Sequence, residues 1–100
     1  WVRRHAPSAE WAAARIALNA LAPGKGETPL LDETRSDGVI GSLVDALPVP
    51  VGRSGAPDEI AAAVQFLLGP DARFFCGSIV FCDGGTDAQF RADDFPSPLR

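Results

Sequence analysis

The stretch that decides the fold is PDEIAAAVQFLLGPDARFFCGSIVFCDGG, which runs from Pro57 to Gly85. Its first residue is favoured in the first turn of a helix, and the two acidic residues after it complement the positive end of the helix dipole. Apolar residues then recur at the spacing of a single helix face. A Gly-Pro pair follows as a stop signal, because glycine accepts a left-handed cap and proline cannot continue a helix. The first part of the stretch therefore predicts a helix over residues 57–68.

The second part of the stretch predicts a buried strand over residues 77–85, because its side chains are mostly β-branched or aromatic and a Gly-Gly pair closes it. An earlier apolar run, residues 15–24, ends in a Pro-Gly turn and predicts another short strand. Strands that are apolar on both faces are typical of parallel sheets covered by helices. The fold class that we expect is α/β.

The remaining segments carry weaker patterns, and we expect all of them to belong to one domain. Residues 1–14 predict the end of a helix followed by a loop, since their alanines and two tryptophans are interrupted by Pro7. Residues 25–54 are rich in turn formers and hold one weak amphipathic patch, which predicts a mobile loop that carries a short helix. Long loops inside compact domains often bind ligands. Residues 86–100 predict an irregular tail.

Composition argues against several classes of function. The net charge is -4 and the basic residues are scattered, so no basic stripe is available for a nucleic acid. The apolar runs are far shorter than the ~20 residues of a membrane span and no basic leader precedes one, so we expect no membrane segment and a cytoplasmic location. Two cysteines without a Cys-x-x-Cys pair and a single histidine argue against a metal site. The sequence begins at Trp1 and contains no methionine, which favours a fragment of a longer protein.

Three segments carry a recognisable family pattern. They are IALNALAPGKGETPL (16–30), VGRSGAPDEIAAAVQFLL (51–68) and GSIVFCDGG (77–85). In order and spacing they resemble the carboxyl-terminal portion of a short-chain dehydrogenase/reductase. The resemblance implies the carboxyl-terminal part of a Rossmann-type doubly wound parallel sheet with flanking helices. Two shorter runs, ETPLL (27–31) and GGTDA (84–88), are most similar to the branch of bacterial hydroxysteroid and aromatic-alcohol dehydrogenases.

The resemblance implies an oxidoreductase that uses NAD or NADP, with cofactor-binding positions at Pro23, Gly24, Gly26 and Thr28. In the family the turn after the earlier strand covers the nicotinamide, so Pro23 and Gly24 would let the backbone pass close to the ring, and Thr28 would add a hydroxyl. Gly26 stands where the family usually has Val or Ile and would offer its peptide groups to the carboxamide. From the residues alone, Pro-Gly is an ordinary turn after a strand, and Thr28 caps a following helix.

The same resemblance implies that residues 29–50 line the substrate site. Their apolar side chains fit a small lipophilic alcohol or ketone, although the packing of a short helix explains them as well. The substrate-binding positions expected on this basis are Leu30, Leu31, Val39, Ile40 and Leu43, with Leu47 as a further apolar member of the loop.

The proton-transfer residues of the family are missing from this chain. The family uses a Tyr-x-x-x-Lys pair, in which the lysine lowers the pKa of the phenol. The sequence has no tyrosine and a single lysine, Lys25, so we expect no catalytic residue here and no activity from the chain alone. The glycine-rich turn that seats the pyrophosphate is also missing, so the choice between NAD and NADP cannot be read from the sequence.

A second hypothesis keeps the same fold without the chemistry. The chain would then act only as an assembly module, in which residues 57–68 and 77–83 pair with another copy, since these elements commonly form a subunit interface in the family. Both hypotheses predict a homo-oligomer. They differ in whether a nicotinamide cofactor binds.

Overall fold

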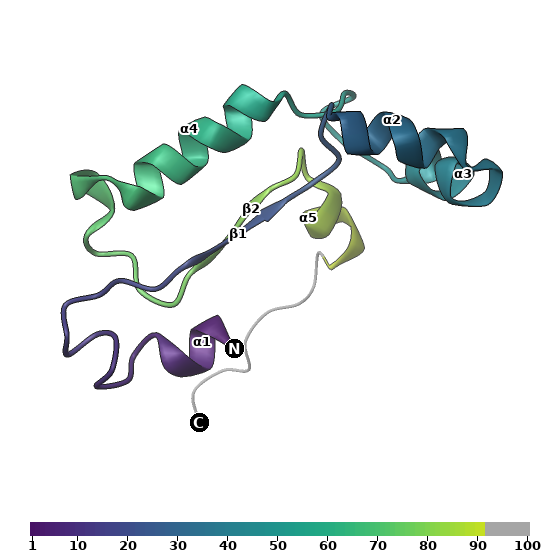
Figure 1. The fold of residues 1–100 in the computed structure, drawn as a ribbon. Helices are drawn as coiled ribbons and strands as arrows, with labels where there is room; N and C mark the ends of the chain where they lie inside the picture. Colours follow the sequence, from purple (N-terminus) through teal and green to yellow (C-terminus); the bar gives the residue numbers. More distant parts are fainter. Residues whose placement is uncertain (92–100) are drawn as a thin grey trace.

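The computed structural model describes residues 1–91 and shows the expected α/β fold (Figure 1). Its elements follow one another as α1 (Val2–His5), β1 (Ala20–Pro23), α2 (Pro29–Ser36), α3 (Gly38–Ala46), α4 (Pro57–Leu68), the 3-10 helix η1 (Pro70–Ala72), β2 (Ile79–Cys82) and α5 (Thr86–Phe90). The expected irregular tail over 86–100 falls partly outside the described residues, since 92–100 are not among them.

The two strands pair in parallel, with Ala20 opposite Ile79 and the same register kept along both strands. The Asn19 side chain fixes where this pairing begins, because its amide oxygen accepts the N–H of Ser78 at 3.0 Å and its amide nitrogen donates to the carbonyl of Phe75 at 3.0 Å. A parallel pair needs a long connection between its strands, and α4 is part of that connection (Figure 1).

Both strands are shorter than the ranges 15–24 and 77–85 expected for them. Arg15 has a φ of 61°, the left-handed region that a non-glycine residue seldom adopts, and turns precede it. The apolar run 15–24 is therefore mostly an approach to the sheet, and only its last residues join the strand pairing.

Helix α4 is the element that the sequence predicted best, because its observed bounds are those expected, 57–68. The side chain of Ala56 cannot accept a hydrogen bond from the first turn of the helix, but the carboxylate of Glu59 accepts the N–H of Ala56 itself at 2.8 Å, which is the other half of a capping box. At the other end the N–H of Gly69 donates to the carbonyl of Phe66 at 3.0 Å.

The expectation of a loop with one short helix over residues 25–54 is wrong, because two helices, α2 and α3, form there. Thr28 caps α2 by accepting the N–H of Leu31 at 3.3 Å. Asp37 caps α3 by accepting the N–H groups of Val39 and Ile40 at 3.0 and 2.8 Å. Threonine and aspartate are both residue types that favour helix starts. The prediction missed them because the many glycines and prolines of the segment are typical of a loop.

The start of the expected irregular tail is also helical, as α5. The carboxylate of Asp83 accepts the N–H of Gly85 at 2.9 Å and the N–H of Asp87 at 2.7 Å, which satisfies two backbone donors at the beginning of the helix. The hydroxyl of Thr86 donates to the carbonyl of Pro48 at 2.8 Å. The contacts of Asp83 are local and of a type that favours helix starts, whereas the contact with Pro48 joins segments far apart in the sequence and no local pattern predicted it.

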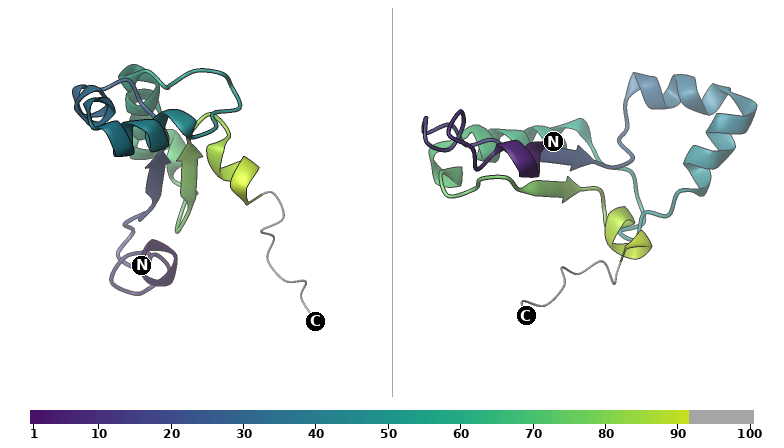
Figure 2. Two further views of the ribbon diagram at one scale, coloured as in Figure 1. Left: turned by 90° about the vertical axis from the view of Figure 1, so that its right-hand side faces the viewer. Right: turned by 90° about the horizontal axis from the view of Figure 1, so that it is seen from below.

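The described residues enclose very little core. The buried apolar residues among them are Ala6, Leu31 and Ala72, whereas Leu68 is 84% exposed and Phe81 is 44% exposed. Helix α4 lies along one face of the strand pair, and the α2–α3 pair projects beyond the strand ends (Figure 2). Within residues 1–91, no helix has the length and apolar character needed to cross a membrane.

Candidate functional site

The carboxyl ends of β1 and β2 lie at the same edge of the sheet, which is where ligands bind in open parallel α/β folds. Beyond β1 the chain continues through Gly24 into α2, and beyond β2 it continues through Asp83 into α5. Two cavities open at this edge, one under α2 and α3 and the other beside the start of α4.

The two strand ends approach each other closely at Gly24. A Cβ atom at this position would lie 2.5 Å from the Cα of Asp83, and the N–H of Gly24 donates to the carbonyl of Cys82 at 3.0 Å. Glycine is therefore required here by the packing of the protein itself. This requirement comes in addition to the close approach to a nicotinamide ring that the family resemblance implies.

Backbone hydrogen bonds join residues 25–27, before α2, to Gly55, and we call this junction at the base of the α2–α3 pair the neck. The N–H of Glu27 donates to the carbonyl of Gly55 at 2.9 Å, and the N–H of Gly55 donates to the carbonyl of Lys25 at 2.9 Å. Gly26 is the residue paired with Gly55 in this parallel bridge. In such a bridge the residue between the two bonding positions points its own N–H and C=O to the other side. The peptide groups of Gly26 are thus turned away from the neck.

The smaller cavity, of about 380 Å³, brings most of the predicted site residues together. Its lining includes all four predicted cofactor positions and two of the five predicted substrate positions, namely Pro23, Gly24, Gly26, Thr28, Leu30 and Leu31. Val44 and Leu47, three residues apart near the end of α3, form the facing apolar wall. One side of the cavity is therefore backbone and glycine, and the other side is aliphatic.

The other three predicted substrate positions do not line this cavity. Val39, Ile40 and Leu43 lie earlier on α3 and are 73%, 52% and 66% exposed. The prediction treated the apolar residues of 29–50 as a single group, but a helix presents only one stripe of side chains to a neighbour. Sequence reasoning had noted Leu47 as apolar, while Val44 received no role.

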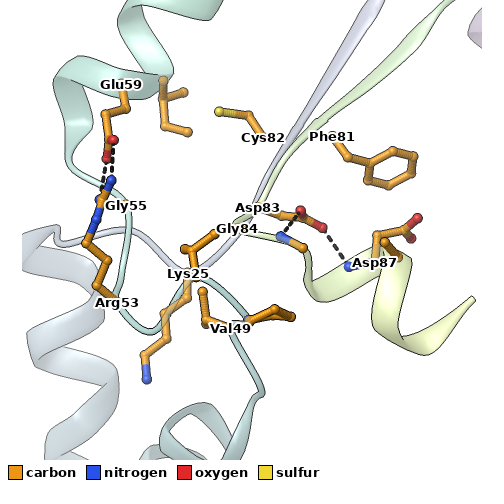
Figure 3. Close-up of a pocket in the computed structure, with 16 residues that line it drawn as sticks. Lys25, Val49, Arg53, Gly55, Glu59, Phe81, Cys82, Asp83, Gly84 and Asp87 are labelled. Atoms are coloured by element: carbon orange, nitrogen blue, oxygen red, sulfur yellow. Dashed lines mark hydrogen bonds and ion pairs between the residues drawn. The ribbon is translucent and has the colours of Figure 1, made fainter. Parts of the chain in front are cut away.

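The larger cavity, of about 720 Å³, lies between the start of α4, the segment before it and the turn after β2 (Figure 3). Arg53 and Glu59 form a two-point ion pair across its wall, with nitrogen to oxygen distances of 2.7 and 2.6 Å. The hydrogen bonds from Arg53 and from the N–H of Ala56 lower the pKa of Glu59 from 4.5 to about 2. These two charged groups are thus paired with each other and with the start of α4.

A second charged network joins the two walls of the smaller cavity. The carboxylate of Asp45 on α3 contacts the ammonium of Lys25 at 3.4 Å and the guanidinium of Arg35 at 3.1 Å. The hydrogen bond from Arg35, followed by that from Lys25, lowers the pKa of Asp45. Arg35 also lies 3.8 Å from the carboxylate of Glu27. The partners are far apart in the sequence, so no spacing rule could have indicated this network.

The arrangement can seat an apolar ring and offer it backbone hydrogen bonds, but it supplies no general acid of the Tyr-x-x-x-Lys type, since the sequence contains no tyrosine. Across the described residues 1–91, no group of three or more histidine, cysteine, aspartate or glutamate side chains could hold a metal ion. Both cysteines are free, with Cys76 exposed and Cys82 half-buried.

Comparison with known proteins gives consistent matches over most of the chain. A family model described as enoyl-(acyl carrier protein) reductase matches residues 3–87. The chain is 38% identical over 94 residues to the 3-alpha-hydroxysteroid dehydrogenase/carbonyl reductase of Comamonas testosteroni, which covers 94% of this chain and 36% of that relative. The match spans 36%, 14% and 30% of the length of three of the curated relatives, so the chain corresponds to only part of each.

Solved structures agree with this match. The 3-alpha-hydroxysteroid dehydrogenase from Pseudomonas sp. B-0831, crystallised with NADH, superposes with a TM-score of 0.86 at 44% identity, over 94% of this chain and 36% of that one. A putative 2-deoxy-d-gluconate 3-dehydrogenase from Agrobacterium tumefaciens with bound NADP superposes with a TM-score of 0.67 at 38% identity, over 79% of this chain and 32% of that one.

Proposed function

Because the chain belongs to the short-chain dehydrogenase/reductase family, we propose that it forms one side of the active site of an NAD(P)-dependent oxidoreductase. The reaction would interconvert a secondary alcohol and a ketone. This chain would supply the loop on the nicotinamide side and the helices on the substrate side. The proposal includes the cytoplasmic location expected from the sequence.

The observation that carries the proposal is the lining of the smaller cavity at the end of β1. All four positions that the family resemblance assigns to the cofactor meet there with aliphatic side chains from α2 and α3. A nicotinamide ring needs one flat apolar contact and hydrogen bonds for its carboxamide, and the substrate needs an adjoining apolar space. The two walls of this cavity supply these two kinds of surface.

The individual residues suit these roles. Gly26 lines the cavity and does not use its own N–H and C=O in the neck, so these groups are available to bond a ligand. The hydroxyl oxygen of Thr28 accepts the N–H of Leu31, but its hydrogen is still able to donate to a carboxamide or phosphate. The helix-cap role and the cofactor role of Thr28 are therefore compatible, although the sequence had presented them as alternatives.

The chemistry of the bound nicotinamide is hydride transfer to or from the carbon that bears the alcohol oxygen, and a proton on that oxygen must be gained or lost in the same step. No tyrosine in this chain can carry that proton. We therefore propose that the proton donor, and the turn that seats the pyrophosphate, belong to residues outside this chain, and that the chain alone is inactive.

The test is a chimera in which this chain replaces the matching carboxyl-terminal third of the Comamonas relative. We expect the chimera to bind NADH, followed by nicotinamide fluorescence, and to reduce a neutral ketosteroid, while the isolated chain does neither. A chimera that folds, as shown by circular dichroism, but fails to bind NADH would refute the proposal. Turnover by the isolated chain would refute the claim that its proton donor lies elsewhere.

A substitution at Gly26 sharpens this test. A Cβ here would meet only ordinary contacts, the nearest being the carbonyl oxygen of Gly55 at 3.7 Å, so Gly26→Val should fit. The added apolar side chain should pack on the ring and lower the Kd of the chimera for NADH by about 3-fold, the effect expected from burying part of one aliphatic side chain. Gly38→Ala on α3, where nothing lies within 4 Å, is the matched control and should leave that Kd unchanged.

The assembly role remains a second candidate because α4 and β2 expose apolar side chains. Leu68 is 84% exposed and Ile79 is 44% exposed, which suits contact with further protein. We propose that these elements contribute to a homo-oligomer of the complete enzyme. Leu68→Glu should reduce the molar mass of the chimera measured by light scattering, and Val39→Glu, at a comparably exposed apolar position on α3, should not.

A further inference from the structure

We propose that Lys25 is a positioning residue, which holds α3 over the smaller cavity through its ion pair with Asp45 and so fixes the substrate-side wall. This inference rests on the function proposed above, because it assigns one wall of the cavity to the substrate. Neither residue was singled out for such a role by the sequence or by the family resemblance.

The first step is the position of the pair, which joins opposite walls of the cavity. Lys25 stands between Gly24 and Gly26 on the backbone wall. Asp45 directly follows Val44 on the aliphatic wall of α3. The ammonium and the carboxylate are 3.4 Å apart, so the ion pair fixes the distance between the two walls.

The second step is the shielding of the lysine. Its side chain is only 12% exposed, although that of Asp45 is 59% exposed. In Figure 3 the Lys25 side chain extends away from Asp83 and Gly84. Within residues 1–91, the carboxylate of Asp45 is the hydrogen-bond acceptor recorded for this ammonium. Neutralising that carboxylate would leave a shielded cation without its counter-charge, which costs more than the loss of an exposed ion pair.

The third step is that few other contacts fix α3. The extensive contacts of α2 and α3 are with each other, and the pair projects beyond the strand ends (Figure 2). The neck of residues 25–27 and 55 holds the chain before α2, and the hydrogen bond from the hydroxyl of Thr86 to the carbonyl of Pro48, at 2.8 Å, holds the chain after α3. The Lys25–Asp45 pair adds a contact from within α3 itself. Arg35 strengthens the tie, since it contacts both Asp45 at 3.1 Å and Glu27 at 3.8 Å.

A looser α3 should weaken substrate binding without altering the bond-making step. The aliphatic wall would contact the substrate equally in the ground state and in the transition state, and losing such contacts raises KM while kcat stays nearly constant. The binding of NADH should stay unchanged in Asp45→Asn, because Asp45 lies on α3 and not among the proposed cofactor positions. A general loss of folding would instead reduce kcat and NADH binding together.

The experiment compares Lys25→Met, Asp45→Asn and the double variant in the chimera, with 5α-androstane-3,17-dione as the neutral ketone probe. We expect each single variant to raise KM about 5-fold and to change kcat less than about 2-fold, the size expected of one partly shielded ion pair. The double variant should be no worse than either single one. Lys25→Arg should restore KM, and Glu33→Gln, which neutralises an exposed carboxylate of α2 outside the network, should behave as wild type.

A second measurement does not require activity. Hydrogen–deuterium exchange at the amides of residues 43–47 should quicken at least about 3-fold in Lys25→Met and Asp45→Asn and stay unchanged in Glu33→Gln. Unchanged exchange in the first two variants, or additive KM effects in the double variant, would overturn the positioning role. If the unsubstituted chimera lacks activity but hydrogen–deuterium exchange responds as expected, the proposed function is wrong and the positioning role of the Lys25–Asp45 pair is supported.

Discussion

Two regions of the site differ in the contacts that hold them: the turns after β1 and β2 with the segment around Val51, which we call the frame, and the α2–α3 pair. The frame is fixed by backbone hydrogen bonds and close approach, as where Gly24 meets Asp83 and where the N–H of Val51 donates to the carbonyl of Gly84 at 3.1 Å. The α2–α3 pair is held to the frame by its neck, by the hydrogen bond from Thr86 to the carbonyl of Pro48, and by the partly exposed charges around Asp45. The comparison teaches that the proposed cofactor side of the site is held by backbone contacts, while the proposed substrate side depends more on side chains that can be replaced.

The strongest challenge to the rigid frame is Gly24→Ala. Its Cβ would lie 2.5 Å from the Cα of Asp83, a backbone atom that cannot rotate away, so the two strand ends must separate. We expect the chimera to lose about 3 kcal/mol of its free energy of unfolding, at the upper end for overpacking, and to lose NADH binding. Urea unfolding followed by circular dichroism measures the first effect. Equal stability in Gly24→Ala and Gly38→Ala would show that the frame is not rigid.

Two glycines with positive φ, one of them in the turn after β2, separate the loss of stability caused by crowding from the loss caused by a left-handed backbone. Gly84 has a φ of 65°, and a Cβ there would lie 2.7 Å from a methyl group of Val49, whereas Gly52 has a φ of 82° and open space around it. Gly84→Ala should therefore lose about 2 kcal/mol and Gly52→Ala about 1 kcal/mol, the latter from the left-handed conformation alone. The two unfolding curves, recorded under the same conditions, test this difference, and coincident curves would mean that the valine contact is soft.

At the junction of frame and helix pair, Thr28→Val removes the cap of α2 while keeping the shape of the side chain. The N–H of Leu31 would lose its acceptor, which should cost about 1 kcal/mol of unfolding free energy. Thr28→Ser keeps the hydroxyl and should be nearly neutral. If Thr28 also contacts the cofactor, the valine variant should weaken NADH binding as well. A loss of stability with unchanged NADH affinity would limit Thr28 to the capping role.

The smallest effect is expected from Glu59→Gln at the exposed ion pair with Arg53. Folding lowers the pKa of Glu59 from 4.5 to about 2. The ionised carboxylate therefore stabilises the fold fully at pH values above 4.5. That contribution should decline as the pH falls below 4.5 and vanish below about 2. The difference in unfolding free energy between wild type and Glu59→Gln, measured from about pH 6 down to pH 2, should shrink in this window. A pH-independent difference would contradict the ion pair.

The sequence predicted elements whose signals are local. Helix α4 has the bounds expected because its Pro57 start, its apolar face and its Gly69 stop all lie within the segment itself. The two helices α2 and α3 were missed even though Thr28 and Asp37 are ordinary caps, since the turn formers around them are typical of loops. The start of α5 was also missed, although Asp83 caps it locally; only the contact of Thr86 with the carbonyl of Pro48 lay beyond local patterns.

The candidate site divides in the same way. The family pattern indicated the four cofactor positions, and the structure gathers Pro23, Gly24, Gly26 and Thr28 around one cavity. Their contact with a cofactor remains a proposal. Of the substrate positions, only those at the start of α2 join them, because the tilt of α3 decides which of its apolar side chains face the cavity.

By itself the sequence determined the α/β class, the parallel strands, the helix between them and the family, since each of these depends on periodicity, turn residues and short motifs read along the chain. Only the tertiary structure decided that Val44 and Leu47 face the cavity, that Gly24 must pass Asp83, and that Lys25 and Asp45 join the two walls. The physical reason is that such contacts join residues distant along the chain, and their energies depend on where the backbone places each side chain.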